Sequence, residues 1–329
     1  MTDAIRDLLD NYWVLMPAKV LAVIVLVLTC FLIVAYMEHK VMAHMQARVG
    51  PMEAGRFHGV LQIVADGIKF LQKESIVPRA ADRWVFALAP VVAVVPVIVV
   101  YGFIPYGRNL VPIRSDVGLF VVLALSSVSV IGVLMAAWSS ANKYSLIGGV
   151  RAAAQLIAYE LPLVLSTVAV AMQASSADLA VIVERQDRFP NVVLPWLAVA
   201  SVVFFIASLA ELTRPPFDMP VADSELVFGY LTEYTGLRFA FFMLAEFAGV
   251  VSLSAIAATL FLGGYRGYVL PDSPLWLILK TFLLTFVVIW VRATFPRMRE
   301  DQLQSFAWVR LVPVSLLVIL ITGFTKVGF

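Results

Sequence analysis

Eight long apolar runs dominate this 329-residue chain and restrict what it can fold into. They fall near residues 17–37, 85–104, 117–138, 154–173, 191–210, 239–263, 274–292 and 307–325. Each run is long enough to cross a hydrocarbon layer roughly 30 Å thick as a helix. The runs are continuous rather than alternating, which favours helices over a transmembrane barrel. The sequence therefore predicts an all-α polytopic membrane protein, with residues 1–329 forming a single integral membrane domain.

The composition excludes several classes of function. Hydrophobic residues make up 61% of the chain and charged residues 14%, whereas a soluble domain carries about 25% charge. A single cysteine, Cys30, excludes an iron–sulfur cluster held within the chain, because such clusters usually need four thiolates. The spacing of His39, His44 and His58 matches no metal-ligand signature, so no metal site is expected. No glycine-rich phosphate loop is present, and a net charge of +2 gives no reason to expect nucleic acid.

The basic residues predict the orientation in the membrane. Most of the 24 Lys and Arg residues fall on one side of the eight spans. The positive-inside rule then places both termini outside and the loops after spans 1, 3, 5 and 7 in the cytoplasm. The first of these loops contains a predicted amphipathic helix, residues 57–73. Periodicity leaves two interpretations for it: a linker helix on the membrane surface, or one wall of a cavity at the headgroup level.

An acidic segment, residues 211–238, follows the fifth span on the cytoplasmic side. Its charged residues are Glu211, Arg214, Asp218, Asp223, Glu225, Glu233 and Arg238. Its excess of acids is opposite to what the topology alone would select, and ionised groups beside lipid are costly unless paired or hydrated. The segment is therefore predicted to be a functional site.

Further ionisable residues lie within the spans. Glu160, Glu246 and Lys280 fall in the fourth, sixth and seventh spans, and Glu211 precedes Arg214 by one helical turn. One interpretation is structural, with Glu246 pairing with Lys280 and Glu211 with Arg214. The other is a proton relay, because carboxylates at several depths of a membrane are suited to take up and release protons. The set as a whole favours the relay.

Two more charged groups have ordinary interpretations from pattern alone. Glu38-His39-Lys40 and Arg48-Val-Gly50-Pro51 read as a charged helix end followed by a turn. Trp290, Arg292, Arg297 and Trp308 read as anchors at the cytoplasmic membrane surface.

The motifs, taken in order, resemble a known family over nearly the whole chain. They include Gln46-Ala-Arg48-Val-Gly-Pro51, Gln62-Ile-Val-Ala-Asp66-Gly-Ile-Lys69, Arg151-Ala-Ala-Ala-Gln155, Tyr159-Glu160, Pro216-Phe-Asp218, Thr232-Glu-Tyr-Thr-Gly236, Ala245-Glu246 and Val291-Arg-Ala-Thr-Phe-Pro296-Arg297. The ordered set is similar to the H-type membrane subunits of bacterial NADH:quinone oxidoreductase, respiratory complex I, and to their equivalent in the mitochondrial NADH dehydrogenase. No single motif carries the resemblance.

The resemblance implies a membrane protein that forms much of a quinone chamber and couples quinone reduction to proton movement. It implies quinone-binding roles for Arg48, Asp66, Phe217, Asp218, Asp223 and Glu225. A proton path would use Glu160, Glu211, Glu246 and Glu233, and a charged cluster would contain Glu38, Lys40, Arg214, Arg238, Arg292 and Arg297. No catalytic residue is expected in this chain.

The same resemblance implies partners and a location. NADH, FMN and iron–sulfur clusters would be held by other proteins of the membrane and peripheral arms of complex I, and quinone would be the substrate. The chain is expected in the bacterial inner membrane, surrounded by lipid.

The chain departs from the family in the acidic segment. The family usually reads Pro-Glu-Ala-Glu-Ser-Glu, whereas this chain has Pro220-Val221-Ala222-Asp223-Ser224-Glu225. One carboxylate is lost and one is shortened. Two alternatives stay open: the membrane anchor of a related energy-converting hydrogenase or deazaflavin-linked dehydrogenase, and a stand-alone secondary transporter. The motif at Thr232 and the arginine-rich residues 292–301 favour the quinone enzyme, and no internal repeat supports a transporter.

Overall fold

The computed structural model describes residues 12–55, 57–221, 223–268 and 270–327, and within these ranges the regular structure is helical. Among the described residues, seven helices are long and apolar enough to cross a membrane. They are α2 (Tyr12–Met45), α4 (Arg83–Phe103), α5 (Gly118–Ser139), α6 (Lys143–Ala174), α10 (Gly236–Phe261), α11 (Pro274–Thr294) and the continuous helical stretch Glu300–Val327. The predicted fifth span is the shorter apolar helix α8 (Pro195–Glu211). The prediction of an all-α polytopic membrane protein is confirmed.

Several helix bounds differ from those predicted by hydropathy. Helix α6 starts at Lys143 rather than near residue 154, because Asn142 caps its first turn by accepting a hydrogen bond from the amide of Tyr144. Helix α8 starts at Pro195 rather than at residue 191, since Asn191–Val193 form a separate 3₁₀ turn, η1. Polar first turns and short turns carry no hydropathy signal, so the apolar runs alone could not locate these ends.

Short elements connect the long helices. They are α7 (Leu179–Glu184), α9 (Asp223–Leu226), the 3₁₀ turn η2 (Gly229–Leu231) and α12 (Glu300–Ser305). Helix α12 continues through a π-helical turn, η3 (Phe306–Leu311), into α13 (Val312–Val327).

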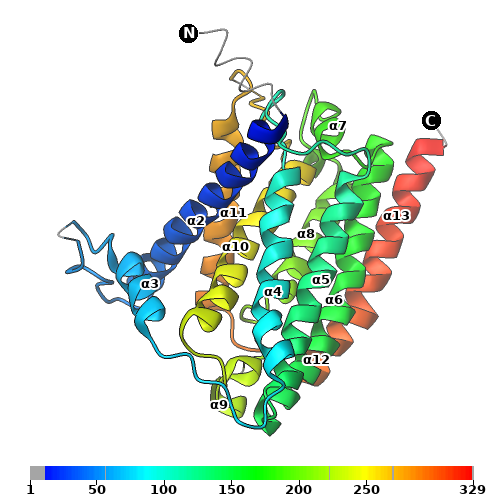
Figure 1. The fold of residues 1–329 in the computed structure, drawn as a ribbon. Helices are drawn as coiled ribbons and strands as arrows, with labels where there is room; N and C mark the ends of the chain where they lie inside the picture. The colour runs from blue at the N-terminus through cyan, green and yellow to red at the C-terminus, as the bar shows by residue number, and fades with distance from the viewer. Residues whose placement is uncertain (1–11, 56, 222, 269, 328–329) are drawn as a thin grey trace, which may run out of the picture.

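Close helix packing relies on glycine at two points. A Cβ on Gly132 of α5 would lie 2.6 Å from the amide nitrogen of Ala93 in α4, and one on Gly149 of α6 would lie 2.1 Å from the Cβ of Ala137 in α5. Small residues let membrane helices approach closely. Figure 1 accordingly shows α4, α5 and α6 side by side, with α13 beyond them and α10 on the other side of α4.

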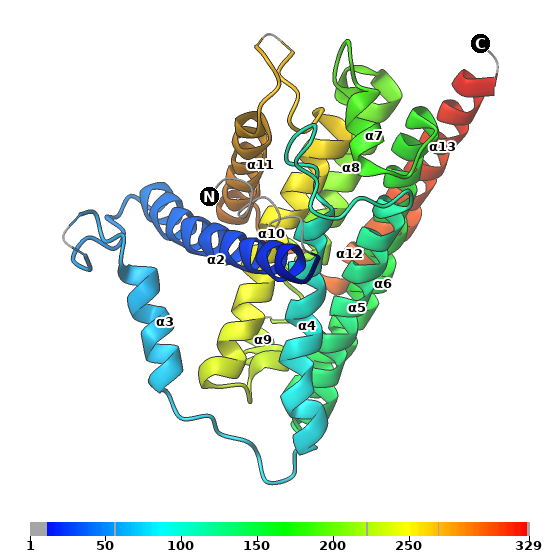
Figure 2. The ribbon, with the colours of Figure 1, turned by 45° about the horizontal axis from the view of Figure 1, so that its top comes forward.

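Helix α3 (Gln62–Gln72) lies at the edge of this bundle, next to the end of the inclined helix α2 (Figures 1 and 2), and its Phe70 ring contacts Phe239 of α10 with centroids 5.6 Å apart. The predicted bounds of 57–73 were too long: Gly55, His58 and Gly59 have positive φ angles of 86°, 52° and 72°, so the chain turns before the helix begins. A Cβ on Gly59 would lie 2.3 Å from the carbonyl oxygen of Pro51, which requires glycine there. The apolar stripe of Val64, Ile68 and Leu71 is exposed, as expected for a helix at the lipid boundary.

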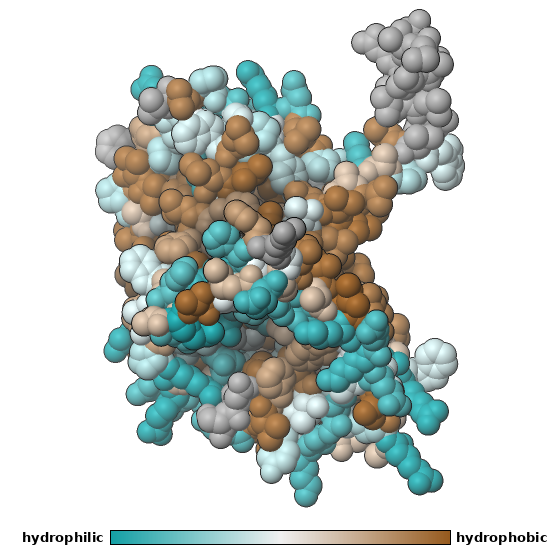
Figure 3. Space-filling model, turned by 90° about the vertical axis from the view of Figure 1, so that its left-hand side faces the viewer, coloured by the Kyte–Doolittle hydropathy of each residue, from teal (hydrophilic) through white to brown (hydrophobic). Residues whose placement is uncertain are grey.

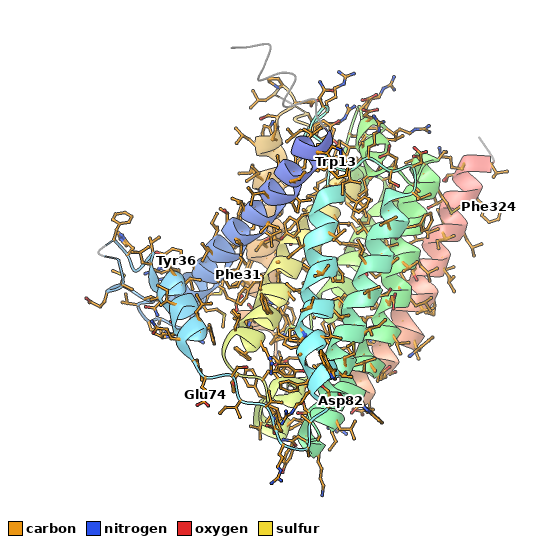
Figure 4. All side chains as sticks on the ribbon, viewed as in Figure 1. Trp13, Phe31, Tyr36, Glu74, Asp82 and Phe324 are labelled. Atoms are coloured by element: carbon orange, nitrogen blue, oxygen red, sulfur yellow. The ribbon has the colours of Figure 1, made fainter. Side chains whose placement is uncertain are left out.

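The two ends of the helical bundle differ in the residues they carry. The start of α2 and the end of α13 lie at the same end (Figure 1), marked in Figure 4 by Trp13 and Phe324, whereas Glu74 and Asp82 lie at the opposite end. On the face of Figure 3, hydrophobic surface covers much of the upper part and hydrophilic residues gather in the lower part. The side of the membrane that each end faces stays a prediction from charge.

Candidate functional site

A cavity of about 930 Å³ lies between α2, α3, α10 and the segment that follows α8. We call it the α3 cavity. Its apolar wall comes mainly from α2 and α10: Leu28, Phe31, Leu237, Phe241, Leu244 and Phe247. Phe31 and Phe247 form an edge-to-face pair with ring centroids 5.7 Å apart, and Figure 4 shows Phe31 between the two helices. Its polar wall includes Glu38, His39, Asp66, Lys69, Arg214, Asp218 and Arg292. The cavity is thus apolar along one side and charged along the other.

Four charged residues at the α3 cavity form one connected group, which we call the Arg214 cluster. Arg214 is 1% exposed and donates from Nη1 to Oε2 of Glu38 at 2.5 Å. Its Nη2 lies 3.1 Å from Oε1 of Glu246, and its guanidinium stacks over the Phe247 ring at 5.0 Å. Arg292 pairs with the other oxygen of Glu38. Two cations therefore share one carboxylate, and Arg214 joins two carboxylates from α2 and α10.

The left-handed backbone conformation of Thr213 explains how Arg214 reaches this position. Thr213 has a φ of 50°, which stops α8 after Glu211 and turns the next side chain away from the helix axis. The sequence-based pairing of Glu211 with Arg214 is therefore wrong. The pairing of Glu246 with Lys280 is also wrong, since Lys280 donates to the carbonyls of Leu262, Gly264 and Arg266 at 2.7, 2.9 and 2.8 Å.

A second, smaller cavity of about 120 Å³ lies deeper in the bundle, among α4, α5, α6, α8 and α10. We call it the inner cavity. Glu211, Ser126, Ser129 and Tyr230 are among its lining residues, and so is Glu246, which also lines the α3 cavity. Oε2 of Glu211 is buried without a hydrogen-bond partner among the described atoms. Glu246 therefore connects the two cavities.

The remaining acids assigned to the proton path lie at different places. Glu160 of α6 accepts a hydrogen bond from the Ser127 hydroxyl of α5 and interacts electrostatically with Glu211. Glu233 accepts a hydrogen bond of 2.5 Å from the side chain of Asn142, near the start of α6. Glu211 and Glu246 thus share the inner cavity, and Glu160 lies near Glu211. Neither Glu160 nor Glu233 is among the residues that line the two cavities.

The residues assigned to quinone binding separate into several groups. Asp66 and Asp218 line the α3 cavity, where Asp66 accepts hydrogen bonds from Gln62 at 3.0 Å and Lys69 at 3.1 Å. Phe217 is buried instead against Tyr159, with ring centroids 5.2 Å apart. Arg48 is exposed beyond α2 and bonds Gln46. The side chain of Asp223 lies outside the described part of the chain.

Glu225 belongs to a separate charged basin of about 680 Å³. Arg151 donates to Glu225 at 2.6 Å and lies 3.6 Å from Glu300, and Arg297 lines the same basin. The hydrogen bond from Arg151, reinforced by the charge of Arg297, holds the pKa of Glu225 below its ordinary value. The sequence alone indicated no role for Arg151.

The charged cluster expected from the sequence is thus only partly assembled. Glu38, Arg214 and Arg292 meet, whereas Lys40 donates to the carbonyl of Pro51 at 2.5 Å. The guanidinium of Arg238 lies over the Phe86 ring at 5.4 Å. Lys40 and Arg238 therefore contact separate segments, and Arg297 lines the charged basin.

Two polar residues missed as site residues hold the acidic segment in place. Gln155 of α6 donates from Nε2 to the carbonyls of Ala210 and Phe217, both at 2.7 Å. Tyr159 packs its ring against Phe217 and donates to the carbonyl of Leu303 at 2.9 Å. Arg151, Gln155 and Tyr159 are spaced by four residues, which places them on one face of α6. That spacing is the signal by which they could have been found.

The fold and the two cavities together define a polytopic helical membrane protein with a charged site reaching into its bundle. Residues 18–323 match the family described as NADH dehydrogenase. A relative from Geobacter sulfurreducens, named as an H-type subunit of NADH-quinone oxidoreductase, is 41% identical, with 95% of this chain and 95% of that protein covered. A protein of the same name from Geobacillus thermodenitrificans is 45% identical, with coverages of 93% and 92%. The chain belongs to the NADH dehydrogenase family.

These relatives carry the name of an oxidoreductase component, not that of a hydrogenase anchor or a transporter. The resemblance stated from the motifs is therefore confirmed, and the two alternatives are not favoured.

Proposed function

We propose that this chain is the quinone-chamber membrane subunit of a proton-translocating NADH:quinone oxidoreductase, in which the α3 cavity receives quinone and the buried carboxylates begin a proton path. The observation that carries the proposal is the position of Glu246. This one carboxylate lines both the α3 cavity and the inner cavity. A change of charge in the larger cavity would act directly on a group that also faces the inner one.

The chemistry of the α3 cavity supports quinone as the ligand. A quinone head has two carbonyl oxygens that accept hydrogen bonds, and its isoprenoid tail is apolar. Arg292, Lys69 and His39 supply donors on the polar wall, while Phe31, Phe241 and Phe247 offer an apolar wall. Binding sites of this kind combine a mainly apolar surface with a few placed polar groups. Val221, where the family has a glutamate, also lines this cavity.

A proton path is supported by three carboxylates from three helices. Glu246 on α10, Glu211 on α8 and Glu160 on α6 are linked by the inner cavity and by the electrostatic interaction between Glu211 and Glu160. Intramembrane carboxylates that face a cavity are typical of proton relays. When quinone takes up electrons, the buried site gains negative charge. The entry of a proton neutralises that charge.

Asp66→Ala is expected to reduce quinone reduction by the assembled complex roughly tenfold, because it removes a polar group from the cavity wall. Electron transfer from NADH to an artificial acceptor at the peripheral arm should stay unchanged. The measurement is the ratio of the two activities in purified complex. Asp301→Ala, on an exposed residue of the charged basin, is the matched control and should leave the ratio unchanged. If an assembled Asp66 variant lost both activities equally, Asp66 would have no specific role in quinone reduction.

The chain purified alone is expected to show no NADH oxidation, because the electron donors are proposed to sit on partner proteins of the complex. Flavin and iron analysis of the isolated chain, together with an NADH assay, checks this. Stoichiometric flavin with NADH turnover would contradict the proposal.

A further inference from the structure

The hydroxyl of Ser127 on α5 is placed between two acceptors. It donates to the carboxylate of Glu160 on α6, and its Oγ also lies 3.2 Å from the carbonyl oxygen of Leu123, one turn earlier on its own helix. A serine hydroxyl carries one hydrogen and two lone pairs, so it can donate to only one of these acceptors at a time.

The arrangement has two states that differ by the proton on Glu160. When Glu160 is ionised, Ser127 donates to its carboxylate. When Glu160 is protonated, the carboxyl group can donate to Oγ, and Ser127 can turn its hydrogen to the Leu123 carbonyl. Both states keep a hydrogen bond between the same two side chains, and only a rotation of the hydroxyl separates them.

The surroundings of Ser127 are suited to this exchange. Its neighbours Ser126 and Ser129 line the inner cavity, together with Glu211 of α8. Glu211 also interacts electrostatically with Glu160. Two nearby carboxylates repel each other when both are ionised. A neighbour that can hydrogen-bond Glu160 in either protonation state therefore stabilises it whether or not it carries the charge.

We propose that Ser127 is a positioning residue for proton transfer through Glu160, acting as a hydroxyl that satisfies both protonation states of that carboxylate. The proposal rests on the proposed role of Glu160 in the proton path. It assigns a function to a residue of α5 that lies outside the acidic segment and outside the set of buried acids.

The test compares Ser127→Thr with Ser127→Val in the assembled complex, because these side chains are nearly equal in volume and differ in the hydroxyl. Reconstituted into phosphatidylcholine vesicles, the complex is driven by NADH, and proton uptake is recorded from about pH 6 to pH 9. Ser127→Val is expected to lower proton-coupled turnover roughly tenfold, the effect of losing a hydrogen bond to a charged group. It should also move the midpoint of the pH profile upward, because the hydrogen bond lost from the ionised form is charge-assisted and stronger than the one lost from the protonated form. Ser127→Thr should stay within about twofold of the parent.

Two controls separate this proposal from the proton path itself. Ser166→Ala removes a buried serine of α6 whose hydroxyl bonds the carbonyl of Leu163, and it should change neither rate nor profile. Glu160→Gln tests whether proton transfer requires the ionisable group of Glu160. If Glu160→Gln abolishes pumping while the Thr and Val variants behave alike, the role of Ser127 is refuted and the path stands. If Glu160→Gln pumps normally, both the path through Glu160 and the role of Ser127 are overturned.

Discussion

Arg214→Leu is expected to lower the amount of folded, assembled protein more than any other single substitution considered. The guanidinium is 1% exposed and pairs with Glu38 and Glu246. Removing one partner of a buried ion pair leaves uncompensated charge in a low-dielectric environment, at a cost of about 3–5 kcal/mol. The measurement is the yield and thermal stability of the complex in mild detergent. Both should fall, and quinone reduction should fall with them.

Two comparison variants separate the buried pair from a general effect of losing an arginine. Arg214→Lys keeps a positive charge but cannot reach both carboxylates in the same forked geometry, so an intermediate stability is expected. Arg299→Leu removes an arginine that is 80% exposed and pairs with Asp301 at 3.3 Å. Exposed pairs contribute about 0–1 kcal/mol, so this variant should assemble normally. Equal stability of the Arg214→Leu and Arg299→Leu variants would show that the Arg214 cluster does not hold the fold.

The long helices could be predicted from the sequence because each helix that crosses lipid must be long and apolar by itself. The pairs within the Arg214 cluster could not. Glu38 lies 176 residues from Arg214 and 254 from Arg292. The resemblance grouped Glu38, Arg214 and Arg292, but it did not indicate which of these charges pair, and it left Glu246 out of the group. The local rule that pairs residues one helical turn apart failed at Glu211 because Thr213, with a φ of 50°, ends the helical geometry the rule assumes.

The acidic segment shows the same limit at short range. Phe217 and Asp218 are adjacent in sequence, yet the ring packs against Tyr159 while the carboxylate lines the α3 cavity. Glu225, seven residues later, faces the basin with Arg151. The motifs placed these residues in one segment, and the structure divides that segment between the α3 cavity and the charged basin. Turns within the segment decide which of its residues share a cavity, and their geometry depends on contacts from α6 that are distant in sequence, such as those of Gln155.

Glu160→Gln is expected to abolish most proton movement while leaving assembly nearly intact, and the partners of Glu160 explain why. Glu38 and Glu246 each contact arginine, so replacing either with glutamine would leave a buried cation without its partner. Glu160 instead accepts its hydrogen bond from the neutral hydroxyl of Ser127. Glutamine has nearly the same shape and can still accept that hydrogen bond, but it cannot ionise. The substitution therefore removes ionisation without creating an unpaired charge.

The expected loss is roughly hundredfold in proton-coupled turnover, within the range that a positioned acid–base group contributes. The yield and melting temperature should stay within the range of ordinary surface substitutions, about 0.5 kcal/mol. Proton uptake per NADH in sealed vesicles, recorded beside NADH oxidation by an artificial acceptor, distinguishes a coupling defect from a damaged peripheral arm. Glu38→Gln is the contrasting variant, since it should lose stability first and activity as a consequence. A Glu160→Gln complex that pumps at the parent rate and ratio would show that protons bypass α6, and the path would then have to run from Glu246 and Glu211 through another helix.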